Sequence, residues 1–79
     1  MRMPLAMLSE KEEATVVEVK GGKGLVRRLS ELGLTPGTKV KILFSNSPGP
    51  AVVDVRGSKI ALGRGLLMRI FVKPEAETH

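Results

Sequence analysis

The sequence predicts a mainly β fold, a small barrel of about five strands with one short helix between the first two main strands. Short segments rich in β-branched residues follow one another along the chain, and turns containing glycine or proline separate them. Sequential short strands with regular turn signals are typical of small all-β barrels. The length allows one domain, which we expect over residues 1–79, with a core at about residues 5–73 and flexible ends.

The chain begins with an apolar lead-in and a first strand. In the segment Pro4–Leu8, Leu5 and Leu8 have the spacing of one helical turn. After the acidic stretch SEKEE, the β-branched run Ala14–Val19 predicts a strand. Three glycines then interrupt the pattern, at Gly21, Gly22 and Gly24.

A helix of about two turns is predicted next. Leu25, Leu29 and Leu32 stand at i, i+4 and i+7, the spacing of one helix face, and we expect all three in the core. Gly33 suits the left-handed position that ends a helix, and Leu34 would then pack back on Leu29 as in a Schellman motif.

A tight turn and a second strand follow the helix. Thr35–Thr38 predicts a turn in which Pro36 presets φ and Gly37 takes a positive φ. Lys39–Phe44 alternates between apolar and basic residues, as strands do. The face expected to point inward consists of Val40, Ile42 and Phe44.

The second half of the chain predicts a hairpin and a last strand. After a loop, SNSPGP, a strand is predicted at Ala51–Val55, and Gly57-Ser58 is predicted as a two-residue type II′ turn. GRGLLM predicts a short irregular or helical turn, and Met68–Val72 a last strand that ends before Pro74. The predicted hairpin register pairs Val55 with Ile60 and Val53 with Leu62.

The segment GGKGLVRRLSELGL, residues 21–34, matches phosphate-binding loops only in part. A P-loop needs glycine at Val17 and Ser or Thr at Gly24, and a dinucleotide fingerprint needs glycine at Arg27. GGKG also fits the G-x-x-G loop of KH domains, but that loop joins two helices and this one follows a strand. A strand-to-helix corner built with glycines is therefore favoured.

The positive charge is concentrated in the body of the chain. The formal net charge is +5, and between Ala14 and Pro74 eleven Lys and Arg stand against three acids, a balance of +8. A basic body favours an anionic partner, although charge also serves solubility. Arg27 and Arg28 are expected in the first turn of the helix, where cations oppose the macrodipole, and with Lys23 they form a basic patch.

Several classes of function are excluded or disfavoured by composition. The chain has no cysteine, and its only histidine is His79, so no catalytic or metal site is predicted. It has no Trp or Tyr to stack on bases, which disfavours nucleic acid as a partner. No segment approaches the roughly 20 apolar residues of a membrane span, and we therefore expect a cytoplasmic protein.

The motifs, taken in order, resemble one family. A strand, GG-x-G, R-x-x-x-L-G-L-x-P-G, a Gly-Pro before a strand and V-x-G-x-x-I-A-L occur together in this chain. In this combination the sequence resembles the ferrous iron transport protein A (FeoA) family from about Leu5 to Val72. It departs from the family at Glu12–Glu13, where a glycine is often seen, and in GRGLLM, where the family more often has a charged helical turn.

The resemblance implies an SH3-like barrel. It also implies a cytoplasmic, non-catalytic accessory of bacterial ferrous iron uptake that binds the GTPase-linked membrane transporter of that system, FeoB. A similar domain ends iron-dependent repressors, where it makes protein contacts. Two alternatives stay open: a small barrel that binds nucleic acid, and a domain that weakly binds Fe²⁺ or another divalent metal.

The surface expected to bind the partner joins the glycine segment to the helix. It consists of Lys23, Val26, Arg27 and Arg28. Val26 lies about 100° around the helix from Leu25, so part of it should be exposed. A homo-oligomer formed through an exposed strand edge also stays open. The residues expected to serve as structural turns are Gly21, Gly22, Gly24, Gly33, Pro36, Gly37 and Gly57.

Overall fold

The computed structural model describes residues 1–46 and 48–75. Along them lie six strands, two α-helices and one 3₁₀ turn, η1: β1 (Met3–Pro4), η1 (Leu5–Met7), β2 (Glu13–Val19), α1 (Lys23–Glu31), β3 (Lys39–Ser45), β4 (Ala51–Val55), β5 (Ser58–Leu62), α2 (Arg64–Leu67) and β6 (Ile70–Pro74).

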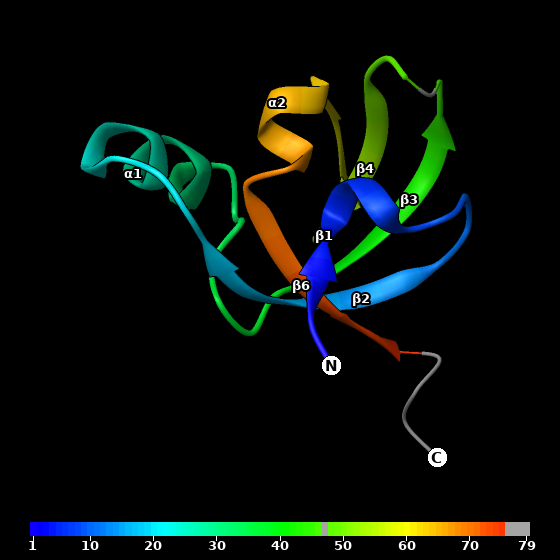
Figure 1. Cartoon of the computed structure of the whole chain (residues 1–79), viewed down its shortest axis with the longest axis horizontal. Helices are drawn as coiled ribbons and strands as arrows, with labels where there is room; N and C mark the ends of the chain where they lie inside the picture. The colour runs from blue at the N-terminus through cyan, green and yellow to red at the C-terminus, as the bar shows by residue number, and fades with distance from the viewer. Residues whose placement is uncertain (47, 76–79) are drawn as a thin grey trace.

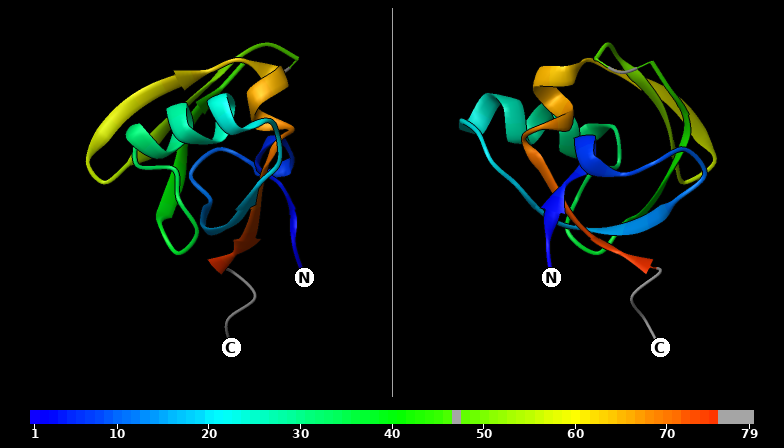
Figure 2. Two further views of the ribbon diagram at one scale, coloured as in Figure 1. Left: turned by 90° about the vertical axis from the view of Figure 1, so that its left-hand side faces the viewer. Right: turned by 45° about the vertical axis from the view of Figure 1, so that its right-hand side comes forward.

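The strands form one antiparallel sheet in the order β1-β6-β2-β3-β4-β5. Figure 1 shows α1 standing to one side of this sheet, and Figure 2 shows the sheet curling round into a small barrel. The predicted mainly β fold, with a helix between the first two main strands, is confirmed. The strand that sequence reasoning missed is β1, which is two residues long and pairs with β6.

The core fills the inside of the curled sheet. Leu5 is fully buried and Leu8 nearly so. Alternate residues of the strands supply most of the rest, because successive side chains of a strand point to opposite faces. The buried cluster consists of Leu5, Leu8, Ala14, Val16, Leu29, Leu34, Val40, Ile42, Ala51, Val53, Val55, Leu62, Leu67, Ile70 and Val72.

The α1 helix contributes less to this core than its leucine spacing predicts. Leu29 is buried and Leu25 is half-buried, but Leu32 is 44% exposed, so its predicted burial is wrong. The helix ends in the predicted Schellman motif: Gly33 has φ +94°, and the Leu34 N–H donates to the Leu29 carbonyl over 2.9 Å. This reversal carries Leu34 into the core and leaves Leu32, the C-cap, pointing outward.

Phe44 is the second residue whose predicted burial is wrong. Val40 and Ile42 are buried as expected, but Phe44 is 56% exposed. The β3–β4 register shifts between Ile42 and Phe44, and Phe44 pairs with Val52 on the outer face. A bulge inserts an extra residue and so turns the following side chains to the other face. The predicted loop that follows includes Ser47, which lies outside the described residues.

The hairpin between β4 and β5 is present, but its predicted turn and register are wrong. The turn residues are Arg56 and Gly57, with φ +55° and +87°, the positive pair that a type I′ turn requires. Val55 therefore pairs with Ser58 and Val53 with Ile60. Type I′ matches the twist of paired strands, and Asp54 Oδ1 accepts a 2.9 Å hydrogen bond from the Gly57 N–H.

The last strand begins and ends two residues later than predicted. Met68 caps α2, where its N–H donates to the Arg64 carbonyl, and it is 45% exposed. Pro74 is the buried last residue of β6, opposite Ala14, and not the residue after the strand. The β1 strand covers β6 only at Phe71 and Val72, so Pro74 lies where one strand edge is unpaired and proline is tolerated.

Candidate functional site

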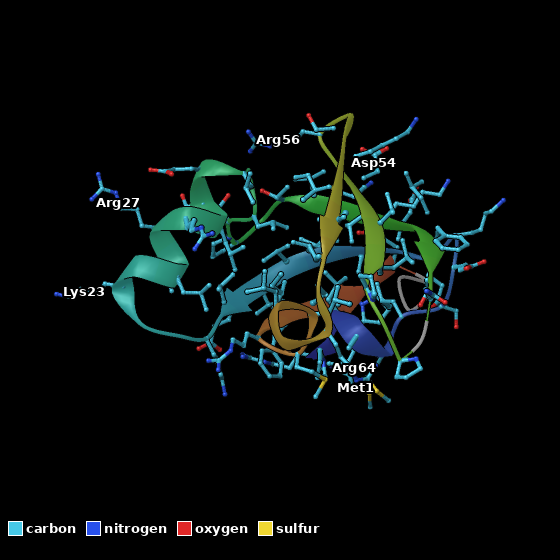
Figure 3. All side chains as sticks on the ribbon, turned by 90° about the horizontal axis from the view of Figure 1, so that it is seen from above. Met1, Lys23, Arg27, Asp54, Arg56 and Arg64 are labelled. Carbon is cyan, nitrogen blue, oxygen red and sulfur yellow. The ribbon has the colours of Figure 1, made fainter. Side chains whose placement is uncertain are left out.

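The α1 helix carries all four residues of the predicted partner-binding surface. Lys23, Val26, Arg27 and Arg28 are all exposed. Figure 3 shows Lys23 and Arg27 projecting outward from the same side of α1. The Arg27 Nε atom lies 3.7 Å from Glu31 Oε2, an i,i+4 pair that is open to solvent and contributes little to stability.

The placement predicted for the two arginines within the helix is wrong. Gly22 is the N-cap and α1 begins at Lys23, so Lys23 is the cation in the first turn. Arg28 lies in the last turn, where a positive charge is favourable to the macrodipole. The helix starts earlier than its first leucine because Lys23 and Gly24, which no apolar spacing marks, already form its first turn.

The glycine segment is the strand-to-helix corner. Gly21 and Gly22 lead from β2 into α1, whereas Gly24, expected in the turn, lies inside the helix. A Cβ on Gly21 would lie 2.6 Å from Leu25 Cδ2, so the chain approaches the helix closely there. A Cβ on Gly22 or Gly24 would have no heavy atom within 4 Å, so close packing constrains only Gly21 among these three glycines.

The other predicted turn residues lie in turns or at an element end. Gly33 follows α1, and Pro36 and Gly37 lie between α1 and β3. Gly37 has φ +95°, and the Thr38 N–H donates to the Thr35 carbonyl, which closes that turn. Gly57 lies in the β4–β5 hairpin.

Val26 borders a groove of about 300 Å³ between α1 and the end of β2. Val26 itself is 36% exposed, which agrees with the partial exposure that its position around the helix predicts. The groove is lined by Val17, Glu18, Val19, Val26, Ser30, Leu34, Thr35 and Pro36. Five of these side chains are apolar, so the groove is suited to an apolar side chain of a partner.

The groove lies where β2 continues beyond the start of β3. The β2–β3 register ends at Thr15, while β2 continues beside β6 to Val19. A bulge between Val16 and Glu18 turns the strand, and Val17 becomes 38% exposed. Sequence reasoning missed Val17, Val19 and Leu34 as groove residues, because the alternation of a strand does not reveal where its pairing stops.

The acid in the groove is neutralised locally. The Arg2 guanidinium donates a hydrogen bond to the Glu18 carboxylate and lowers the pKa of that carboxyl below its ordinary value. Within residues 1–46 and 48–75, Lys23 and Arg28 take part in no ion pair. Lys23 lies one helical turn before Val26 on α1, so the rim of the groove carries a positive charge that no acid of the described chain pairs with.

A second hollow, of about 380 Å³, crosses the outer face of β2, β3 and β4. Its charged residues alternate in sign across the sheet. Lys41 stands opposite Glu13 on β2 and opposite Asp54 on β4. Such cross-strand pairs stabilise a sheet, and this mixed face is a weaker site for a ligand of one charge.

Acidic side chains near the two ends of the chain accept hydrogen bonds. Glu12 accepts a hydrogen bond from the Ser9 N–H, Glu10 from the Ser45 N–H and Glu75 from the Thr15 hydroxyl. No group of three or more His, Cys, Asp or Glu able to hold a metal ion occurs in the part of the chain that the structure describes, which excludes His79. None of the helices in that part is long and apolar enough to cross a membrane.

Comparison with known proteins places this architecture in a family. The model of the FeoA domain matches residues 3–74. The putative Fe(2+) transport protein A of Methanocaldococcus jannaschii is 41% identical over 70 residues, which cover 89% of this chain and 84% of that protein.

Solved structures of the same family agree with the fold. A crystal structure of an iron uptake regulatory protein (FeoA) superposes with a TM-score of 0.88 and 34% identity, covering 94% of this chain and 99% of that one. FeoA of Stenotrophomonas maltophilia was solved in complex with zinc and is described as a prokaryotic SH3 domain protein. It superposes with a TM-score of 0.79 and 28% identity, covering 90% of this chain and 89% of that one. The chain, an SH3-like barrel that carries one side helix, belongs to the FeoA family of ferrous iron transport proteins.

Proposed function

We propose that the chain is a cytoplasmic accessory protein of ferrous iron uptake that acts by binding an FeoB-type GTPase transporter. The family supports the iron system, and the resemblance to FeoA sequences points to this transporter as partner. The observation that carries the proposal is the apolar groove beside α1, with Val26 on its rim and exposed cations next to it.

Apolar and charged contacts contribute differently to binding at this surface. Apolar side chains in the groove supply affinity when a partner side chain removes them from water. Lys23, Arg27 and Arg28 speed the encounter with an acidic partner and set its orientation, since rim charges act mainly on association rates. We therefore expect the partner segment to present an apolar anchor with acidic residues near it.

Affinity capture tests the choice of partner. The purified domain is immobilised and exposed at physiological salt to detergent-solubilised membranes and cytosol of cells that make an FeoB-type transporter. The expected result is retention of that transporter, identified by mass spectrometry. Retention of nucleic acid without the transporter, with an affinity that falls steeply as salt rises, would favour the nucleic-acid alternative instead.

A further inference from the structure

A second surface of the barrel combines exposed methionines with arginines. We call it the methionine face: Met7 and Met68 with Arg64 and Arg69. The two methionines are 66% and 45% exposed. Met7 ends η1 and Met68 caps α2, and η1 and α2 pack against each other. Figures 1 and 2 show α2 at the opposite end of the barrel from the N-terminus, so Met1 is not part of this face.

These methionines are not needed to complete the core. Directly beneath them, Leu5 of η1 and Leu67 of α2 are buried. Met7 and Met68 extend from the same two elements into solvent. Flexible, polarisable thioether chains adapt to irregular or changing surfaces, and methionine is often used where a contact has no fixed shape.

The charge around this face is positive and uncompensated. Arg64 and Arg69 are exposed, and neither forms an ion pair with any residue in 1–46 or 48–75. The sequence contains no acid between Asp54 and Glu75.

We infer that the methionine face binds the surface of an anionic lipid bilayer. Exposed apolar side chains beside unpaired cations are the two features by which proteins hold an interface of this kind. Separate flexible chains that protrude would each need a matching pocket on a protein partner, whereas the headgroup region of a bilayer deforms around them. The positive charge selects an acidic surface. The deformable headgroup region then favours acidic phospholipid over a protein surface of fixed shape.

This contact would leave the groove beside α1 free. Figure 3 shows Lys23 and Arg27 projecting from a different side of the molecule from Arg64. The domain could thus lie on the membrane and still present α1 to a neighbouring membrane protein. The lipid contact nevertheless needs no transporter, so it is independent of the function proposed above.

Vesicle flotation with the purified chain and pure lipid tests this inference. We expect binding to vesicles that contain phosphatidylglycerol and little binding to pure phosphatidylcholine, with a bound fraction that falls as salt rises. Each arginine near such a surface contributes about fivefold in binding, so Arg64→Gln with Arg69→Gln should lower it about 25-fold. Met7→Ser with Met68→Ser, which leaves the charge unchanged, should lower it about tenfold.

The matched control removes the same charge from the other surface. Arg27→Gln with Arg28→Gln should keep binding within about twofold, with the fold of every variant checked by circular dichroism. Absence of binding to phosphatidylglycerol, or an equal loss in both arginine pairs, would overturn the inference. The flotation experiment contains no transporter, so absence of lipid binding would not contradict the proposed partner. Likewise, failure to capture the transporter would not contradict lipid binding.

Discussion

At the residue scale, Gly33 and Gly37 show two different reasons why a position requires glycine: a positive φ and close packing. Both have positive φ, +94° and +95°. A Cβ on Gly33 would also lie 3.2 Å from Val55 Cγ1, whereas nothing lies within 4 Å of one on Gly37. Gly33 thus combines a backbone requirement with close packing against the hairpin, while Gly37 has the backbone requirement alone.

Alanine at these two positions should measure the difference. We expect Gly37→Ala to lower the free energy of unfolding by about 1 kcal/mol, because a left-handed conformation is costly for a residue with a Cβ. Gly33→Ala should cost about 1–2 kcal/mol more, since Val55 must also move. Urea denaturation of both variants gives the comparison, and equal losses would show that the Val55 contact is easily relieved.

The pair Arg2–Glu18 gives a prediction about pH. Its hydrogen bond lowers the pKa of Glu18, so the pair stabilises the fold above the ordinary carboxyl pKa, and this contribution is lost as pH falls through the lowered value. In an NMR titration of the side-chain carboxyl, Glu18 should titrate below an unpaired glutamate. Replacement Arg2→Ala should raise the midpoint, and an unchanged midpoint would mean that the pair does not persist in solution.

At the element scale, the chain follows its alternating pattern until a bulge or a turn intervenes. The strands β2, β3 and β4 lie close to where β-branched alternation predicts them. The pattern fails at Phe44 and around Val17, because a bulge is set by pairing with a distant strand and leaves no mark in the local sequence. The predicted burial of Leu32 is wrong for a related reason, because the chain reversal at Gly33 brings Leu34 into the core instead.

The hairpin turn can be tested by one substitution. Arg56 has φ +55°, and asparagine accepts this conformation more readily, so Arg56→Asn should stabilise the protein by about 0.5 kcal/mol. If Gly57-Ser58 formed the turn instead, residue 56 would be part of a strand and asparagine would weaken it. Thermal and urea unfolding of the variant therefore distinguish the two registers.

At the scale of the whole molecule, the barrel presents two separate surfaces. Sequence reasoning placed Val26, Arg27 and Arg28 on the helix and Lys23 in the glycine segment before it, and predicted the partial exposure of Val26. It could not find the groove beside Val26, since that depends on where β2 stops pairing with β3. It also missed the methionine face, because residues far apart in the chain meet there only when η1 packs on α2.

The claim that α1 and its groove bind the transporter is tested most directly by calorimetric titration of the domain with the purified transporter in detergent. Two variants form the matched pair: Val26→Asp on the rim of the groove, and Leu32→Asp at the C-cap of α1, which is at least as open to solvent but does not line the groove. We expect Val26→Asp to weaken binding about tenfold or more, and Leu32→Asp to leave it nearly unchanged, because buried anchors dominate interface energy. Equal affinity of the two variants, with both folded by circular dichroism, would contradict the assignment of this surface.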